Sequence, residues 1–164
     1  MEFARIAGAK IIAVDINEQR LASCREKQNV QDTINPLKEN ITGKLTEITN
    51  GDMATVIIDA TGNQKAINNS FHLMAHGGRY ILVGLQNSDV IFSHPEFHRR
   101  EGTLMSSRNA TRQDFEYVIN CISEGLLHPE NYITHRVSFD EANKHFESWL
   151  NGQTEVIKAM ISAG

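Results

Sequence analysis

Three short runs of aliphatic and β-branched residues, separated by segments with helical spacing, constrain the fold of this chain more than any other feature. The runs are "KIIAVDI" (10–16), "TVIIDA" (55–60) and "RYILVGL" (79–85). Continuous hydrophobicity over so few residues is typical of strands buried on both faces of a parallel sheet. Strand, helix and strand at this rhythm predict βαβ units with right-handed crossovers. The expected fold class is α/β, with a doubly wound parallel sheet.

Start and stop signals place the helices between and after these strands. Helices are expected over residues 18–27, which Asn17 caps and Asn29 ends, over 37–49, and around 67–74, where "HGG" ends the last one. Thr111 with Asp114, and Ser138 with Glu141, resemble capping boxes that begin two later helices. Shorter strands are expected at 32–36, 88–92, 102–107 and 155–161, and residues 3–7 read as the end of a helix stopped by Gly8.

Length and composition exclude several classes of protein. The chain has 164 residues, a net charge of −4 and 22% charged residues, as in an ordinary globular domain. No electrostatic binding of nucleic acid is therefore expected. No segment approaches the roughly 18 apolar residues that span a bilayer, so no membrane partner is expected. The two cysteines, Cys24 and Cys121, are far apart, which indicates neither a zinc cluster nor a disulfide framework and favours a cytoplasmic setting.

Asp15 is the strongest candidate for binding chemistry. It ends the first strand, where a doubly wound dinucleotide domain places the carboxylate that accepts hydrogen bonds from both hydroxyls of the adenosine ribose. A carboxylate there repels a 2′-phosphate and so favours NAD over NADP. The same residue equally suits an aspartate that ends a strand and caps a turn. Arg20, one helical turn later, suits either the same ribose or a solvated helix surface.

Other motifs carry weaker signals. Glycines 62, 77, 78 and 84 flank strands, where they let a nucleotide approach the backbone but also serve as ordinary turn residues. Two histidine pairs, 72/76 and 94/98, have the spacing of zinc ligands on a helix, yet one lacks a third ligand and the other contains Pro95. Surface histidines are therefore the better interpretation, and no metal site is expected. Ser106 and Ser107 lack the glycines of a nucleophile elbow, so no catalytic residue is assigned.

Five segments taken together resemble the zinc-type, medium-chain alcohol and polyol dehydrogenases. They are "GAKIIAVDINEQRLA", "VIIDATGN", "GGRYILVGL", "EGTLMSSRNA" and "ITHRVSFDEANKHFESWLNGQTEVIKAMI". The pattern is most similar to the bacterial sugar- and sugar-acid-oxidising members and covers essentially the whole chain. In that family these segments form the C-terminal half, so the resemblance implies that residues 1–164 are a partial NAD-binding Rossmann domain with a closing segment from about residue 131.

The resemblance also implies site residues. Asp15 and Arg20 would hold the adenosine ribose, and Ala60, Thr61 and Gly62 would line the cofactor groove. The backbone near the nicotinamide carboxamide would come from Val83, Gly84, Leu85, Thr103 and Met105. Lys158 occupies the place of a basic residue that reaches the pyrophosphate.

Several features of the family are missing. Its first Rossmann strand, with the G-x-G-x-x-G turn that cradles the pyrophosphate, should lie just upstream of Glu2, and so should the domain that carries the zinc ligands. The expected sheet is thus truncated at its N-terminus, without the strand between "KIIAVDI" and "TVIIDA". We expect the gap to be closed by direct pairing of these two strands or by a strand from another copy. Residues 28–32 depart as well, since relatives usually have a Gly-Ala pair there.

The resulting hypothesis is a nucleotide-binding fragment of a zinc-dependent, NAD-linked dehydrogenase, inactive alone. The parent reaction would oxidise a secondary alcohol, a polyol or sugar acid, by hydride transfer to NAD. The alternative is a non-catalytic remnant that dimerises and binds nucleotide weakly or not at all. A methyltransferase-like domain also places an acid after its second strand, but the closing segment argues against it. By analogy, the edge strand from Ser88 to Phe92 would form a homodimer.

Overall fold

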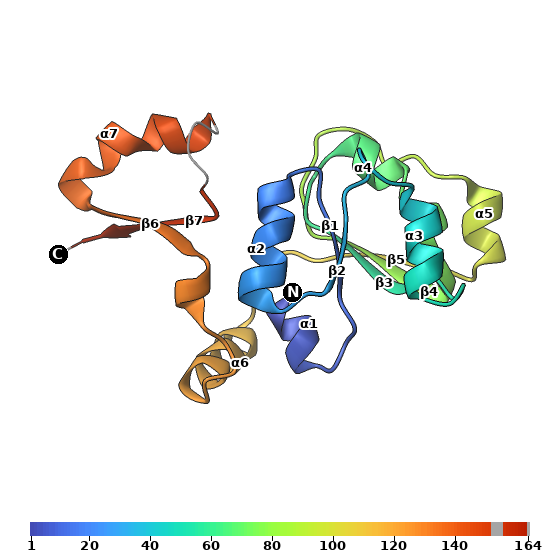
Figure 1. Cartoon of the computed structure of the whole chain (residues 1–164), viewed down its shortest axis with the longest axis horizontal. Helices are drawn as coiled ribbons and strands as arrows, with labels where there is room; N and C mark the ends of the chain where they lie inside the picture. The colour runs from blue at the N-terminus through green and yellow to red at the C-terminus, as the bar shows by residue number, and fades with distance from the viewer. Residues whose placement is uncertain (152–155, 164) are drawn as a thin grey trace. The chain divides into compact units, whose positions relative to one another are not determined.

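A computed structural model describes residues 1–151 and 156–163 of the chain (Figure 1). Contacts between Cα atoms divide the chain into two compact units. The central unit is Ile11–Ala110, and the terminal unit combines Met1–Lys10 with Thr111–Gly164. No helix of the described ranges is both long and apolar enough to cross a membrane.

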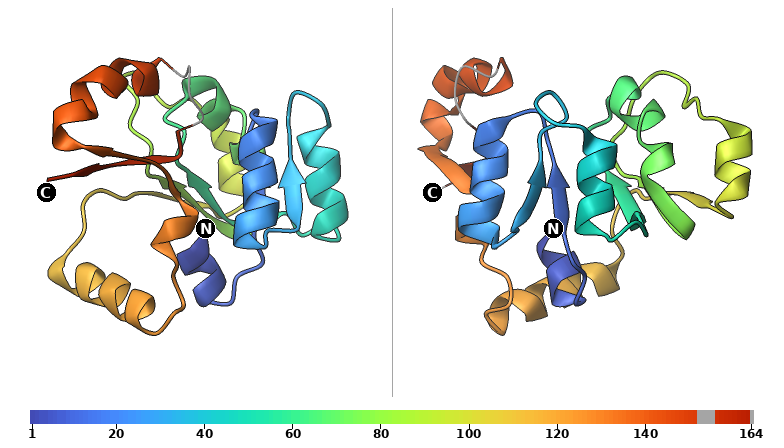
Figure 2. Two further views of the ribbon diagram at one scale, coloured as in Figure 1. Left: turned by 60° about the vertical axis from the view of Figure 1, so that its left-hand side comes forward. Right: turned by 45° about the vertical axis from the view of Figure 1, so that its right-hand side comes forward.

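The central unit is an α/β arrangement in which strands alternate with helices. In chain order its elements are β1 (Ile12–Val14), α2 (Glu18–Gln28), β2 (Asp32–Ile34), α3 (Ile41–Ile48), β3 (Ala54–Asp59), α4 (Gln64–Asn68), the 3₁₀ turn η1 (Phe71–Leu73), β4 (Met74–Leu82), α5 (His94–Arg99) and β5 (Thr103–Ser106). Every strand pair is parallel, and both views of Figure 2 show α2 and α3 standing alongside β1 and β2. The predicted α/β class with parallel strands is confirmed.

The strands of the central unit form two separate ladders. One pairs β1 with β2, and the other runs β3-β4-β5. Across the described part of the chain, β1 and β3 share no ladder, so the expectation that these two strands pair directly is wrong. A ladder forms only between strands that the fold brings within hydrogen-bonding distance, and the partners that β1 and β3 have are β2 and β4. Val14, Val56 and Ile58 remain 46%, 39% and 56% exposed.

Strand β4 begins earlier than the sequence predicts. The expected helix near residues 67–74 ends as α4 at Asn68, and after η1 the strand starts at Met74 rather than at Arg79. "HGG" therefore lies inside a strand instead of breaking a helix. Gly77 has φ +66, and its N–H donates to the Arg100 carbonyl at 2.7 Å, so the irregular backbone is held from outside the ladder.

Residues 88–92 do not form the predicted edge strand. Their polar contacts go to side chains instead: the N–H of Ile91 donates to Asn68 Oδ1 at 2.9 Å, and the carbonyl of Asp89 accepts from Gln64 Nε2 at 3.3 Å. A strand needs a hydrogen-bonded neighbour, and none of the described ladders includes this segment. Its apolar side chains Val90 and Phe92 pack against the core.

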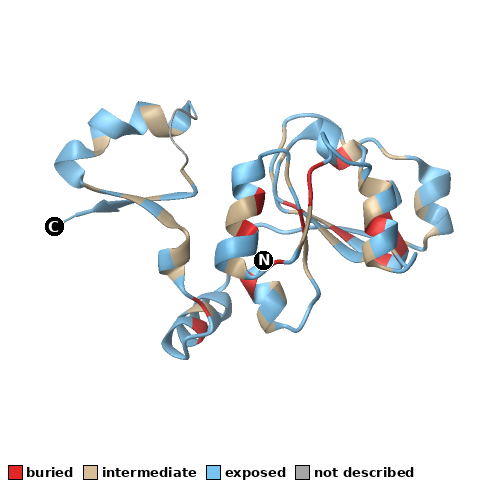
Figure 3. Cartoon of the chain, viewed as in Figure 1, coloured by how far each residue is buried: buried red, intermediate tan, exposed pale blue. Residues whose placement is uncertain are grey.

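Buried apolar side chains of the central unit include two separate clusters. Figure 3 colours the buried positions of the chain red. The first, which we call the α2 cluster, consists of Ala13, Leu21, Cys24 and Val30 with Ile11 against it. The second, the Tyr80 cluster, consists of Ile67, Phe71, Met74 and Tyr80. The rings of Phe71 and Tyr80 stack with centroids 4.4 Å apart. Burial raises the pKa of the Tyr80 hydroxyl, which bonds to Ser70 Oγ at 2.6 Å.

The terminal unit contains α1 (Glu2–Ile6), α6 (Arg112–Ser123), the 3₁₀ turn η2 (Pro129–Asn131), β6 (Ile133–Ser138), α7 (Phe139–Leu150) and β7 (Lys158–Ser162). Strand β6, which the sequence patterns did not predict, pairs in parallel with β7. The predicted capping box of α6 is present, whereas Ser138 starts α7 without bonding a backbone N–H. Of the predicted strand 155–161, residue 155 lies outside the described residues, and β7 runs from Lys158.

Candidate functional site

Three segments of the central unit follow the carboxyl ends of parallel strands. Asp15 comes directly after β1, residues 60–62 follow β3, and residues 83–85 follow β4. In open α/β sheets, ligands bind outside these strand ends. The structure therefore puts most of the predicted cofactor residues in positions from which a ligand is normally held.

The carboxylate of Asp15 is oriented and accessible. Its Oδ1 accepts the N–H of Asn17 at 2.9 Å, and its Oδ2 lies 3.6 Å from Nη1 of Arg20. The side chains of Asp15 and Arg20 are 30% and 63% exposed, respectively. Carboxylate oxygens accept several hydrogen bonds, so this group retains capacity for a vicinal diol. Arg20 thus lies beside Asp15, and the expectation that the two residues hold an adenosine ribose stays a prediction.

The turn after Asp15 is fixed by a residue of the loop that follows β2. Asn35 is 3% exposed, and its Nδ2 donates to the carbonyl of Ile16 at 3.2 Å and also to Glu18. These hydrogen bonds join the two loops that follow β1 and β2. The bond from Asn35, followed by that from Lys38, lowers the pKa of Glu18 below its usual range. Glu18 is therefore held as a carboxylate at the start of α2, where the helix dipole also favours negative charge.

The 60–62 and 83–85 turns touch each other. A Cβ added to Gly84 would lie 2.3 Å from the backbone nitrogen of Gly62, closer than real Cβ contacts come. A Cβ on Gly62 would lie 2.5 Å from the Leu85 carbonyl oxygen, and Gly62 has φ +59. Both positions therefore require glycine. Glycine at these two positions lets the backbones of the two turns approach each other closely.

Other predicted residues of the site lie further along their elements. Thr103 pairs with Arg79 at the start of β5, and Met105 pairs with Ile81. The carboxyl end of β5 is Ser106, and the N–H of Ser107 donates to the Leu82 carbonyl at 2.9 Å. Ser106 and Ser107, to which the sequence assigns no catalytic role, are thus nearer the 83–85 turn than Thr103 is. Lys158 is an exposed residue of β7 in the terminal unit, and its predicted contact with the pyrophosphate stays a prediction.

Sequence reasoning missed two residues of this region. Asp59, at the end of β3, is 7% exposed and bonds to both Thr61 and Gly62. Asn35 is the other. "DATG" and "NP" are turn signals that place an acid or amide at a strand end. Which groups those side chains bond depends on residues up to 19 positions away, and no local pattern contains that information.

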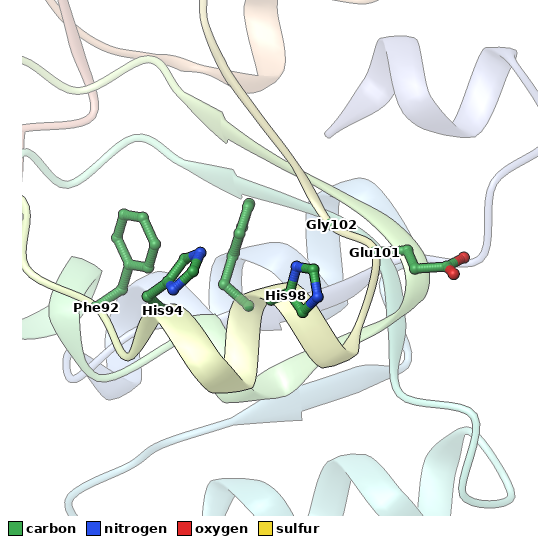
Figure 4. A pocket seen from close by; sticks show the side chains of 6 residues that line it. Phe92, His94, His98, Glu101 and Gly102 are labelled. Atoms are coloured by element: carbon green, nitrogen blue, oxygen red, sulfur yellow. The ribbon is translucent and has the colours of Figure 1, made fainter.

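No metal centre accompanies these turns among the described residues. Within residues 1–151 and 156–163, no group of three or more His, Cys, Asp or Glu side chains could hold a metal ion. His94 and His98 stand on the same side of α5, with ring centroids 5.8 Å apart, over a hollow lined also by Phe92 and Gly102 (Figure 4). His72 Nε2 instead bonds to Thr42 Oγ1 at 3.0 Å. A catalytic zinc needs three protein ligands, which this donor set does not provide.

Comparison with known proteins agrees with the geometry. The chain is 35% identical over 159 residues to L-galactonate-5-dehydrogenase of Escherichia coli. The alignment covers 97% of this chain and 46% of that protein. It is 35% identical over 163 residues to alcohol dehydrogenase 1 of Zea mays, covering 93% of this chain and 42% of that one. The chain thus spans about half the length of these relatives.

A solved structure shows the same fold. A protein from Escherichia coli, described as a short chain alcohol dehydrogenase and solved with NADH, superposes with a TM-score of 0.83 at 24% identity over 93% of this chain and 44% of that chain. The sequence profile described as "Zinc-binding dehydrogenase" matches residues 1–124. On this profile, its relatives and its parallel α/β fold, the chain belongs to the zinc-binding dehydrogenase family.

Proposed function

We propose that this chain is the nucleotide-binding part of an NAD-linked alcohol dehydrogenase. The reaction of the whole enzyme would be oxidation of a secondary alcohol, a polyol or sugar acid, by hydride transfer to NAD. One observation carries the proposal: the accessible carboxylate of Asp15 directly follows β1, while the 60–62 and 83–85 turns of the same unit pack against each other through Gly62 and Gly84 at the ends of β3 and β4. The NADH complex of a protein with this fold supports the same cofactor.

The chemistry of Asp15 favours NAD over NADP. An ionised carboxylate accepts hydrogen bonds from the two ribose hydroxyls but repels a 2′-phosphate. Arg20 could pair with a phosphate, yet its guanidinium already faces Asp15. The residues present therefore fit the unphosphorylated ribose.

Zinc chemistry is not assigned to these residues. Since the described side chains offer no set of three ligands, polarisation of the alcohol would depend on ligands that the described part of the chain does not bring together. Hydride transfer belongs to the nicotinamide itself. What the chain would contribute is binding and orientation of the cofactor.

The interrupted sheet favours a second candidate function. This candidate is a non-catalytic module that associates with another copy and binds nucleotide weakly or not at all. Association would cover the apolar residues that stay exposed while β1 and β3 are not paired with each other. We place the dimer contact of this proposal at residues 88–92, where Ile91 is 63% exposed.

Calorimetric titration of the purified chain with NADH and NADPH separates the two functions. We expect NADH to bind more tightly, and Asp15→Ala to weaken NADH binding by roughly tenfold to a hundredfold, because a lost hydrogen bond to a charged group costs about 1.5–3 kcal/mol. Glu26→Ala, which removes an equal charge from the exposed surface of α2, is the matched control and should bind as the unmodified chain does. No heat of binding from a folded chain would instead support the non-catalytic module.

A further inference from the structure

Asp59 is a buried acid at the centre of the candidate site. It is the last residue of β3 and is 7% exposed. Burying an ionised carboxylate is costly unless it is hydrogen-bonded. The hydrogen-bond partners of the Asp59 carboxylate therefore indicate the role of this side chain.

Both carboxylate oxygens of Asp59 bond to the 60–62 turn. Oδ1 accepts the hydroxyl of Thr61 at 2.6 Å, and Oδ2 accepts the N–H of Gly62 at 3.1 Å. The Thr61 hydroxyl oxygen in turn accepts the N–H of Asn63 at 3.0 Å. The side chain thus closes the turn and holds Gly62 in its left-handed conformation.

The backbone of the same residue bonds to the other turn. The carbonyl of Asp59 accepts the N–H groups of Val83 and Gly84, both at 2.9 Å. Because Gly62 and Gly84 also touch, with room for no Cβ between them, the position of one turn determines the position of the other. One residue therefore fixes two segments that come from different strands.

We infer that Asp59 is a positioning residue whose carboxylate holds Gly62, and through it Gly84, in the arrangement that binds the cofactor. The inference rests on the proposed function, in which these turns lie against the nicotinamide half of NAD. Asp59 does not touch the cofactor in this account. It acts by setting where the bare backbone of the two turns lies.

The first test removes the carboxylate. In Asp59→Ala we expect NADH affinity to fall roughly tenfold, in keeping with the loss of two hydrogen bonds that order a turn. We also expect faster amide hydrogen exchange at Gly62 and Gly84. Asp52→Ala, at an exposed acid in the turn before β3, should change neither quantity.

Two further variants separate positioning from general stability. Asp59→Asn keeps an acceptor for the N–H of Gly62, so it should restore part of the affinity that Asp59→Ala loses. Gly84→Ala should weaken binding by disturbing the same contact, so the double variant with Asp59→Ala should bind little worse than either single variant. All affinities are compared at a temperature where far-UV circular dichroism shows each variant folded. Should Asp59→Ala not fold, Thr61→Val, which removes one donor and keeps the carboxylate, takes its place.

The outcomes are distinguishable. Unchanged affinity and unchanged exchange in Asp59→Ala would overturn the inference while leaving NAD binding intact, and so would fully additive losses in the double variant. If the unmodified chain does not bind NADH, the proposed function and the cofactor role of Asp59 both fail. In that case the exchange rates of Gly62 and Gly84 alone decide whether Asp59 sets the two turns.

Discussion

At the scale of single residues, the site depends on amides and acids that bond across loops. Asn35 uses nearly all of its hydrogen-bonding groups: besides its bonds to Ile16 and Glu18, its Oδ1 accepts the N–H of Leu37 at 3.0 Å, and its own N–H donates to Glu39 Oε1 at 3.1 Å. The loop after β1 is consequently held by a residue of the loop that follows the neighbouring strand β2. A position that the sequence presents as part of a short strand stopped by proline thus supports Asp15.

Glu18 gives this network a pH dependence. Its pKa lies below the usual 4.5 in the folded chain, chiefly because Asn35 donates to it, so the ionised group stabilises the fold above that pH and loses this contribution as the pH falls through the folded value. We expect Glu18→Gln to lower the free energy of unfolding at pH 7 and to differ less from the unmodified chain in acid. Urea denaturation across this range measures the difference. A difference that stays constant with pH would contradict the assignment, and Glu26→Gln is the control on the same helix.

Asp15 and Asp59 show how far sequence reasoning reaches at this scale. The position of Asp15 beyond the end of a strand was predictable, because it depends on one local fact, the short aliphatic run that precedes it. Asp59 ends a strand too, but its importance depends on how the 60–62 turn meets the 83–85 turn, two segments more than 20 residues apart. Contacts of that kind are made by the fold and leave no local pattern.

At the scale of elements, the two ends of α2 followed local rules and the start of β4 did not. Asn17 caps α2 through the N–H groups of Gln19 and Arg20, and Asn29 ends it with φ 54, both as the sequence predicts. Strand β4 instead begins before "HGG", because Met74 pairs with Ala54 of β3. Helix termini are satisfied by neighbouring residues, whereas the length of a strand depends on its partners.

The two capping motifs of the terminal unit make it possible to test how much a capped helix terminus contributes to stability. Thr111 Oγ1 accepts the N–H of Asp114 at 3.3 Å, while Ser138 Oγ donates to the Glu141 side chain and caps no backbone group. We expect Thr111→Ala to cost about 1 kcal/mol of stability, a typical value for losing an N-cap, and Ser138→Ala to cost less. Thermal unfolding of both variants measures this, with Thr111→Ser as the conservative control. Equal losses would show that the motif rather than the geometry determines stability.

At the scale of the whole molecule, the family and the parallel α/β fold could be predicted and the sheet's continuity could not. Five segments in the order of one family are a strong joint signal, and the profile match over residues 1–124 confirms it. Two open edges of buried strands favour closure, either by direct pairing of β1 with β3 or by a strand from another copy. The first does not occur in the described part of the chain, and the second stays a prediction, because the sequence of a strand does not state which strands the fold brings beside it.

Open edges predict association. Ile58 is 56% exposed on β3, so Ile58→Lys should reduce self-association at little cost in stability, because a charge on an exposed strand opposes edge-to-edge pairing. Light scattering with size-exclusion chromatography measures the change. Ile91→Lys tests the 88–92 dimer contact in the same way. If neither substitution alters the association, the chain associates through another surface. Ile57→Lys, which places a charge against the Tyr80 cluster, should unfold the chain and serves as the contrast.

The separation of the two hydrophobic clusters has a consequence for ligand binding. The α2 cluster and the Tyr80 cluster share no residue, so two parts of the central unit bury their apolar side chains in separate sets. Asp15 belongs with the first part, and Gly62 and Gly84 belong with the second. A dinucleotide that contacted both would link their folding equilibria, contributing stability that grows with the logarithm of its concentration above the dissociation constant. Such a dinucleotide would act as a reversible cross-link between the two parts, so the unfolding transition would be more cooperative in the complex than in the free chain.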